Sequence, residues 1–383
     1  MKHIVFMTSS IAQDFCVELY KKFVDMVNFT ASLPDYKVTL IIPKDKQVHY
    51  FNKYKDHFNI SKDVNIVKII RPFKIDGKII YNGPKAKNKE RYKLTLDKNK
   101  IYDNMPDKVD LFVYFSIFMN VNDVIPLLKE SLIEGYTSTN FSAVRQQLDQ
   151  VVIPALIHLR DNCKVLNIIN DFYEPILERD YPGKCLTLSY YDTSDGLLSA
   201  KILDAGCQMI DCAEKDLDFV FGFTTLGMFR KYLSDYINTH IIETDTIKIF
   251  ERNKYDNSRN HPINQIDYYK MLERSKFSLI ASATKRDRFS WFRLIELLTR
   301  KNIPLLLEDS NYQDAKEFIE SDLYEIYKKY NLFVSYNDFI NDKIAELDYD
   351  TIWKEIENSD FLKKVLNKEN NQNLFIERCL CLA

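Results

Sequence analysis

Short apolar runs alternate with amphipathic stretches along the first half of the chain. Each apolar run has the length of a buried strand and ends at polar or turn-forming residues. The predicted strands are His3–Thr8, Tyr36–Ile42, Val64–Ile70, Asp110–Phe115 and Val165–Ile169. Helical spacing of the apolar residues predicts helices at Ile11–Val27, Val124–Leu132 and Ala143–Asp161. Strands that alternate with helices in this way are typical of a mostly parallel sheet.

The second half repeats the alternation after a less regular passage at 185–215, where we place a domain junction. That passage holds only weak strands, at Leu186–Tyr190 and Gln208–Ile210. Beyond it we predict strands at Phe219–Phe221, Ile247–Phe250, Phe277–Ile280 and Pro304–Leu307, and helices at Gly227–Tyr236, Gln265–Glu273 and Phe289–Arg300. The expected fold is therefore α/β with two Rossmann-like domains, 1–185 and 186–345. Helices at 346–383 complete the chain, and we expect the last to pack on the first domain.

Composition and charge narrow the class of protein. The 383 residues are 46% hydrophobic and 13% aromatic, which is typical of a globular protein and not of a disordered one. The net charge is −2, so a nucleic-acid contact would have to come from a local patch. No apolar run approaches the roughly 18 residues that span a bilayer, and no signal peptide is recognisable. We expect a cytoplasmic protein whose seven scattered cysteines are free thiols and which has no dedicated metal site.

Three common catalytic motifs are absent from the sequence. A P-loop, a G-x-G-x-x-G dinucleotide motif and a G-x-S-x-G nucleophile elbow are all missing. These absences argue against a P-loop nucleotidase, a dinucleotide oxidoreductase and an α/β-hydrolase.

The segment from Tyr269 to Asp309 carries the clearest candidate chemistry. A strand leads into the small-residue turn Ala281–Ala283, where a backbone can approach a phosphate closely, and then into a helix whose N-terminus favours an anion. Arg293 and Glu296 lie three residues apart on one face of that helix. An arginine suits a diphosphate and a carboxylate suits ribose hydroxyls. The same spacing is also common in surface ion pairs.

This segment resembles the donor half of GT-B glycosyltransferases, most closely the DNA β-glucosyltransferases of T-even bacteriophages. In that family a helix with Arg-x-x-Glu precedes a strand that ends in acidic residues, as at 292–296 and 305–309 here. The resemblance implies that Arg293 binds the donor diphosphate and Glu296 the ribose. It also implies that an acceptor domain (1–185) and a donor domain (186–345) face a central cleft.

Further donor-binding residues follow from the same resemblance. The family's first donor-domain strand ends in a Gly-Ser turn followed by arginines, and Gly222–Thr225 with Arg230 is similar. Leu226 stands near the position of the family's first arginine, so we expect a cation from 285–288 to replace it. Arg230 fits an exposed helix cation equally well. The expected donor-binding set is Gly222, Thr224, Thr225, Arg230, Ser282, Lys285, Arg288, Arg293 and Glu296.

Asp171 is the candidate general base. It follows the predicted strand Val165–Ile169, and α/β sheets bind ligands at the carboxyl ends of their strands. The stretch matches the family's strand that ends in its catalytic aspartate. The alternative is an aspartate that caps the following turn.

A basic segment at 71–93 is the candidate acceptor-binding region. It contains eight lysines and arginines against two acidic residues, with Tyr81 and Tyr92 interleaved, and its glycines and proline predict a loop or hairpin. Such a segment can follow a phosphate backbone, although most charged runs are simply solvated. The nucleic-acid-binding candidates are Lys74, Lys78, Lys85, Lys87, Lys89 and Arg91.

The leading hypothesis from the sequence is a phage-type enzyme in the host cytoplasm. It would transfer a sugar from UDP-glucose to a hydroxymethylated base in DNA, with inversion, and a role for a divalent cation stays open. One alternative keeps the fold but has a bacterial surface polysaccharide or a protein as acceptor. A second is a non-catalytic module that binds nucleotide sugars or nucleic acid. The sequence indicates no membrane partner and does not fix the oligomeric state.

Overall fold

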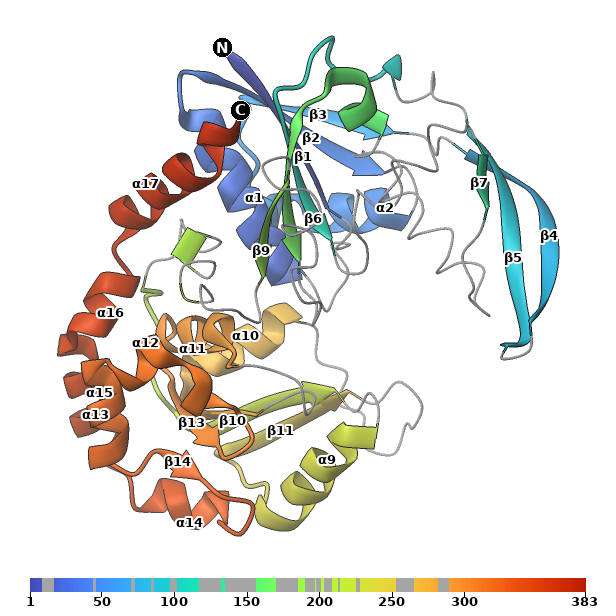
Figure 1. Cartoon of the computed structure of the whole chain (residues 1–383). Helices are drawn as coiled ribbons and strands as arrows, with labels where there is room; N and C mark the ends of the chain where they lie inside the picture. The colour runs from blue at the N-terminus through green and yellow to red at the C-terminus, as the bar shows by residue number, and fades with distance from the viewer. Residues whose placement is uncertain are drawn as a thin grey trace. The chain divides into compact units, whose positions relative to one another are not determined.

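The computed structural model divides the chain into two compact units (Figure 1). Unit 1 contains Met1–Leu188 and Phe375–Ala383, and unit 2 contains Ser189–Leu374. The structure describes residues 1–8, 17–43, 46–69, 73–83, 86–96, 102–116, 132–134, 156–169, 185–189, 197, 201–202, 209–212, 214–224, 228–252, 265–281 and 289–383.

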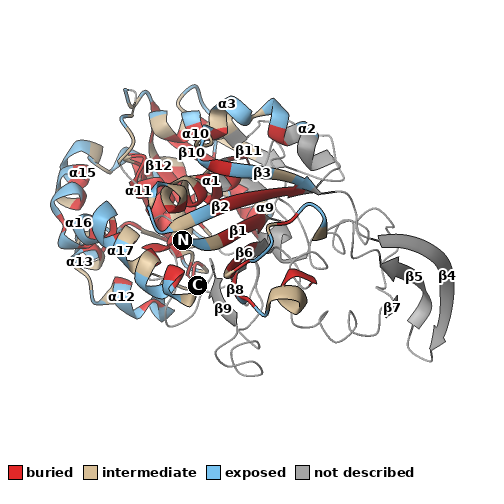
Figure 2. Ribbon diagram, turned by 90° about the horizontal axis from the view of Figure 1, so that it is seen from above, coloured by how far each residue is buried: buried red, intermediate tan, exposed pale blue. Residues whose placement is uncertain are grey.

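Unit 1 is built on a six-stranded sheet in the order β3-β2-β1-β6-β8-β9. The strands are β1 (Lys2–Thr8), β2 (Tyr36–Pro43), β3 (Val64–Ile69), β6 (Leu111–Ser116), β8 (Lys164–Ile169) and β9 (Cys185–Ser189). The pairs β1–β2, β2–β3, β1–β6 and β6–β8 are parallel. Ile4 to Met7 of strand β1 are completely buried, because a parallel sheet is covered on both faces. Figure 2 shows β1 in the colour of buried residues.

Helices and the end of the chain complete unit 1. They are α1 (Val17–Ser32), α2 (Lys46–Lys53), α3 (Lys55–Phe58) and the last residues of α17 (Lys368–Arg378). Phe23 of α1 packs edge-on against Phe6, with 5.9 Å between the ring centroids. The ring centroids of Phe29 of α1 and Phe375 of α17 are 6.1 Å apart, so aromatic packing attaches the final residues to this unit.

A separate three-stranded antiparallel sheet holds the basic segment. It contains β4 (Phe73–Gly83), β5 (Ala86–Leu96) and β7 (Leu132–Glu134), in the order β4-β5-β7. β4 and β5 form a long hairpin whose register runs from Phe73 opposite Leu96 to Gly83 opposite Ala86. Of the two structures predicted for 71–93, a loop or a hairpin, the described residues form the hairpin.

Unit 2 is built on a five-stranded sheet in the order β11-β10-β12-β13-β14. Its strands are β10 (Leu217–Thr224), β11 (Ile247–Arg252), β12 (Ser275–Ile280), β13 (Ile303–Leu307) and β14 (Phe333–Val334), and their pairings are all parallel. All five residues of β13 are buried, as the continuous apolar run at that position predicts. The predicted α/β fold with two Rossmann-like sheets is confirmed.

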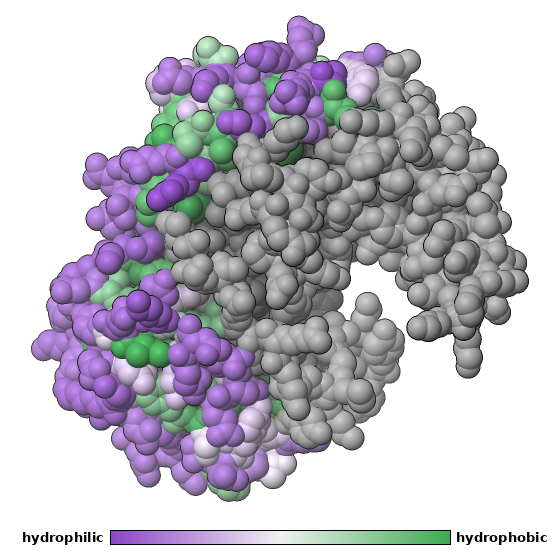
Figure 3. Space-filling model, in the orientation of Figure 1, coloured by the Kyte–Doolittle hydropathy of each residue, from purple (hydrophilic) through white to green (hydrophobic). Residues whose placement is uncertain are grey.

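The helices of unit 2 follow its strands in alternation and then continue to the end of the unit. They are α9 (Met228–His240), α10 (Gln265–Arg274), α11 (Trp291–Leu298), α12 (Lys316–Ile319), α13 (Asp322–Lys329), α14 (Ile340–Ala345), α15 (Tyr349–Asn358), α16 (Asp360–Val365) and the start of α17. Side-chain oxygens of Ser321, Asp348 and Ser359 accept backbone N–H groups at the starts of α13, α15 and α16. The visible outer face of these helices is mostly hydrophilic (Figure 3).

Some element boundaries differ from those predicted. The helix predicted to end at Val27 continues to Ser32, because Met26, Val27 and Thr30 are buried and extend its apolar face. Leu132, predicted as the end of a helix, begins strand β7 and pairs with Thr95. The rest of the helix predicted at 124–132 lies outside the described residues, as do residues 143–155 of the next one.

Candidate functional site

The carboxyl edge of the unit 2 sheet is where the chain connections change direction. From β10 the chain passes to β11 on one side, and then to β12 on the other side of β10. In open parallel sheets, ligands bind outside the carboxyl ends of the strands at such a switch point. The described pairing of β10 with β12 ends at Phe219 and Phe277, whereas its pairing with β11 continues to Thr224 and Arg252.

Gly222 lies in the part of β10 beyond its pairing with β12, and Tyr268 of α10 packs directly against it. The Gly222 N–H donates to the Tyr268 hydroxyl at 3.0 Å. A Cβ atom at residue 222 would lie 2.6 Å from Cε2 and 2.8 Å from Cζ of the Tyr268 ring. Glycine is required here because any side chain would displace that ring.

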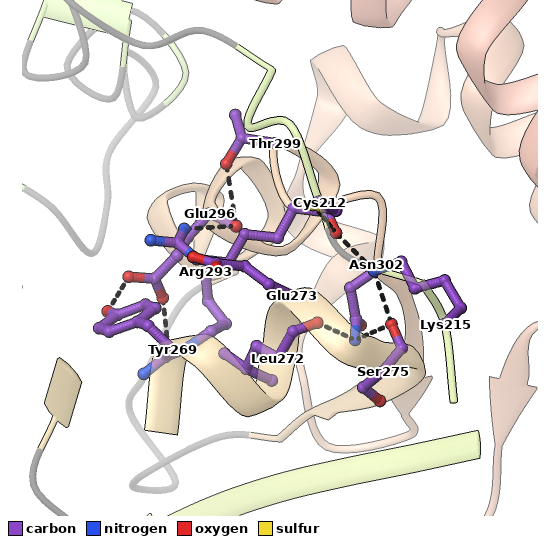
Figure 4. Close-up of polar contacts among 11 residues, drawn as sticks. Cys212, Lys215, Tyr269, Leu272, Glu273, Ser275, Arg293, Glu296, Thr299 and Asn302 are labelled. Carbon is purple, nitrogen blue, oxygen red and sulfur yellow. Dashed lines mark hydrogen bonds and ion pairs between the residues drawn. The ribbon is translucent and has the colours of Figure 1, made fainter. Parts of the chain in front are cut away.

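Arg293 and Glu296 form an ion pair on α11, and Figure 4 shows it beside Tyr269. Ser290 caps this helix by accepting the N–H of Arg293. The two Glu296 oxygens have different partners: Oε1 accepts the Tyr269 hydroxyl, and Oε2 accepts Nη1 of Arg293. The Glu296 side chain is 0% exposed, whereas that of Arg293 is 37% exposed. The pair therefore differs from an ordinary surface ion pair, because its carboxylate is removed from water.

Arg300 completes the polar surroundings of Glu296. Its Nη1 donates to the Glu296 backbone carbonyl at 3.0 Å, and its guanidinium lies 4.2 Å from the centroid of the Tyr269 ring. Burial, followed by the negative charge of Glu296, raises the pKa of Tyr269 well above its usual value. The Tyr269 hydroxyl thus stays protonated and donates a hydrogen bond to the Glu296 carboxylate.

A second polar cluster lies at the amino edge of the same sheet and is also drawn in Figure 4. Lys215 Nζ donates to the backbone carbonyls of Ser275 (2.9 Å) and Arg300 (2.7 Å), and Cys212 Sγ donates to the Arg300 carbonyl at 3.1 Å. The Asn302 amide donates to the Ser275 carbonyl at 3.1 Å. Burial lowers the pKa of Lys215 to about 8. This cluster satisfies carbonyls near the end of α11 and the start of β12.

The donor residues predicted from the sequence fall into three groups. The structure brings Arg293 and Glu296 into contact and places Gly222 in the same domain near the same sheet edge. Thr224 is the last residue of β10 and Arg230 lies in the first turn of α9. The remaining donor candidates, Thr225, Ser282, Lys285 and Arg288, lie outside the described residues.

The predicted base and acceptor residues belong to unit 1. Asp171 lies outside the described residues, two positions after the end of β8. Lys74 and Lys78 are on β4, and Lys87, Lys89 and Arg91 are on β5, whereas Lys85 lies outside the described residues.

Tyr268 and Tyr269 were assigned no role from the sequence. Both lie within the first five residues of α10, a helix that was predicted correctly. The available signal was their place just before a predicted buried strand, but aromatic residues there are usually core. Their role depends on how α10 packs against β10 and α11, which a local pattern does not contain.

The described residues offer no obvious metal site or membrane span. Among them, no group of three or more His, Cys, Asp or Glu side chains is arranged to hold a metal ion. None of the described helices is long and apolar enough to cross a membrane. Cys163, Cys212, Cys379 and Cys381 are free thiols.

Comparison with known proteins gives a likeness of fold. No family model and no curated protein matches the sequence. A mutant of T4 phage BGT in complex with UDP-glucose is 12% identical, with a TM-score of 0.47 over 98% of this chain and 99% of that one. TarM is 9% identical (TM-score 0.45; 100% and 98% covered), and the N-terminal domain of Candida albicans trehalose-6-phosphate phosphatase is 12% identical (TM-score 0.43; 100% and 97% covered). At such identities the substrates and residue roles of those proteins do not carry over to this chain.

Proposed function

We propose that the protein is a glycosyltransferase that uses a nucleotide-sugar donor bound by unit 2. The observation that carries this proposal is the buried Glu296 carboxylate, paired with a partly exposed Arg293 near the carboxyl edge of a parallel sheet. A buried carboxylate is costly to maintain, and such groups gather at functional sites. A guanidinium that reaches solvent from this position is suited to bind a diphosphate.

Arg293 and Glu296 have complementary roles in this proposal. The partly exposed guanidinium of Arg293 would bind the donor diphosphate. Glu296 would bind the ribose hydroxyls, which are donors of the same kind as the Tyr269 hydroxyl that now occupies its Oε1. Exchange of the Tyr269 hydroxyl for a ribose hydroxyl keeps the carboxylate fully hydrogen-bonded. The glycine at 222 and the residues after it would let the backbone approach the phosphates.

The proposed reaction is a single displacement with inversion. Asp171 takes the proton of the acceptor hydroxyl as its oxygen attacks the anomeric carbon of the sugar. The bond from that carbon to the diphosphate breaks, and the leaving diphosphate keeps the electron pair. Arg293, with Arg230 and a cation from 285–288, stabilises the charge that develops on it. A divalent cation bound by the diphosphate itself is compatible with this scheme.

The proposed acceptor is a hydroxymethylated base in DNA, and the proposed donor is UDP-glucose. The long hairpin β4–β5 supports the DNA acceptor, because five of the six predicted basic residues lie on its two paired strands. Binding through such residues weakens steeply as the salt concentration rises. A base within a duplex would have to leave the stack to react.

A turnover screen tests the activity and its acceptor separately. Nucleotide sugars are incubated with the full-length chain, with and without hydroxymethylated DNA, and release of the nucleoside diphosphate is measured. We expect UDP release from UDP-glucose, stimulated by the DNA at low salt. If a UDP-sugar is bound but DNA neither binds nor stimulates turnover, the DNA acceptor is wrong while the donor site stands.

The proposed base has its own test. Asp171→Asn should abolish transfer but leave donor binding intact, because the substitution removes the proton acceptor and not a donor contact. Unchanged turnover would refute Asp171 as the base. If neither the wild-type chain nor the variant turns over although both bind UDP, the protein is a non-catalytic nucleotide-sugar-binding module.

A further inference from the structure

The hydroxyl of Tyr268 lies at the switch point of the unit 2 sheet, next to Gly222 of β10. Tyr268 is the fourth residue of α10, and its hydroxyl accepts the Gly222 N–H at 3.0 Å. Gly222 is three residues beyond Phe219, the last residue of β10 that pairs with β12. The hydroxyl therefore satisfies a backbone donor where β10 is no longer held by its neighbour β12.

Packing fixes the Tyr268 ring on three sides. The absence of a side chain at Gly222 makes room for it, since a Cβ atom there would come within 2.6 Å of the ring. Phe250 of β11 packs edge-on against it at 6.1 Å between centroids, and the Tyr269 ring does so at 5.9 Å. A phenol held this way keeps its hydroxyl in one place without any adjustment when a ligand arrives.

The chemistry of the hydroxyl suits an anion. A phenol can accept one hydrogen bond and donate another. The Gly222 amide uses the acceptor function, and among the described residues none accepts the phenol proton. Burial raises the pKa of Tyr268, so the proton stays in place at neutral pH. The neighbouring Tyr269 ring carries the hydroxyl that Glu296 accepts, so the Tyr268 phenol lies near the Arg293–Glu296 pair, and the charges of both residues act on it.

We propose that Tyr268 is a donor-binding residue whose hydroxyl donates a hydrogen bond to the diphosphate of the nucleotide sugar, beside the Arg293 guanidinium. This inference rests on the proposed function and adds a contact that the sequence did not indicate. The bond has a charged acceptor, which makes it stronger than a bond between neutral groups. It also links the ligand to the β10 backbone through the Gly222 amide.

Binding measurements on Tyr268→Phe test the inference. Wild-type protein is first titrated calorimetrically with UDP, ADP, GDP and TDP, and the diphosphate that binds is then compared with its nucleoside. Loss of a hydrogen bond to a charged group should weaken diphosphate binding about tenfold or more. Nucleoside binding should be unchanged, because the base and ribose do not touch the hydroxyl.

A matched control and a second variant separate this contact from a loss of structure. Tyr349→Phe removes another tyrosine hydroxyl of unit 2, which donates to the Lys301 carbonyl at 2.6 Å, and should leave both affinities unchanged. Gly222→Ala should reproduce the selective loss, because the new methyl group displaces the Tyr268 ring. Thermal unfolding of each variant shows that it is folded at the assay temperature.

The outcomes are distinct. If Tyr268→Phe binds the diphosphate as tightly as the wild type, the inference is overturned while the proposed function stands. Equal weakening of nucleoside and diphosphate also overturns it, because the hydroxyl then does not act on the phosphates. Failure of the wild-type chain to bind any of the four diphosphates overturns both the inference and the proposed function.

Discussion

The two edges of the unit 2 sheet handle their charged residues in opposite ways. At the amino edge, Asp216 pairs with Arg274 through two hydrogen bonds, and their side chains are 49% and 45% exposed. On α11, which begins after the carboxyl end of β12, the carboxylate of Glu296 is 0% exposed and pairs with Arg293. Both members of the Asp216–Arg274 pair are thus exposed, whereas the carboxylate of the Arg293–Glu296 pair is buried.

This difference supports the proposal that the Arg293–Glu296 pair, and not the Asp216–Arg274 pair, belongs to a donor site. An exposed pair is screened by water and needs no special surroundings, so it is compatible with a purely structural surface. A buried carboxylate loses its hydration and persists only if hydrogen bonds and opposite charge replace it. Tyr269 and Arg293 supply these to the Glu296 carboxylate, and Arg300 donates to the backbone carbonyl of the same residue. The exposed Asp216 carboxylate pairs with Arg274.

Removal of Arg293 should give the largest loss of stability. Arg293→Met leaves the buried Glu296 carboxylate without its counter-charge, and the free energy of unfolding should fall by about 3–5 kcal/mol. Chemical denaturation followed by circular dichroism measures it. The double variant Arg293→Met/Glu296→Gln should recover part of the loss, and no recovery would show that the cost does not come from an uncompensated charge.

Removal of the Tyr269 hydroxyl should have an intermediate effect. Tyr269→Phe deprives Glu296 Oε1 of its donor, and a missing hydrogen bond to a buried charged group costs about 1–3 kcal/mol. The same denaturation experiment applies, with Tyr349→Phe as the control for loss of a tyrosine hydroxyl elsewhere in unit 2. An equal loss in both variants would mean that Tyr269 has no special relation to the carboxylate.

Lys215 at the amino edge should give a pH-dependent effect. Burial lowers its folded-state pKa to about 8, below the ordinary value of 10.5, so between these two values the unfolded chain binds more protons than the folded one. The stability contributed by this group therefore rises with pH from about 8 to about 10.5. Relative to Lys215→Met, the melting temperature of the wild type should increase over that range, and a constant difference would contradict the lowered pKa.

Substitution of Asp216 should have the smallest effect. Asp216→Asn removes an exposed ion pair, and the melting temperature and donor affinity should stay at wild-type values within error. Arg274→Ala, which removes the other member of the pair, should behave in the same way. A clear loss of donor binding in either variant would break the distinction between the two edges.

Local sequence patterns were sufficient for most of the fold. The apolar run at 304–307 predicted a buried strand, because the side chains on both faces of a covered parallel strand are apolar, and all residues of β13 are buried. The pattern failed at Leu132, where pairing with Thr95 of β5, distant in sequence, determines a strand. The spacing of Arg293 and Glu296 predicted their contact, since residues three apart share a helix face. The burial of Glu296 and the parts played by Tyr268 and Tyr269 depend on helix packing, which spacing does not encode.

The most direct test of the central claim is whether unit 2 binds a nucleotide sugar through Arg293. Isothermal titration of the full-length chain with UDP-glucose should give saturable binding. Arg293→Lys keeps the positive charge but lacks the planar fork, so binding should weaken at least tenfold. Arg274→Lys, the same change at the other edge, should bind as the wild type does. No binding of UDP-glucose or any other nucleotide sugar by the wild-type chain, or equal affinities in all three proteins, would contradict the account.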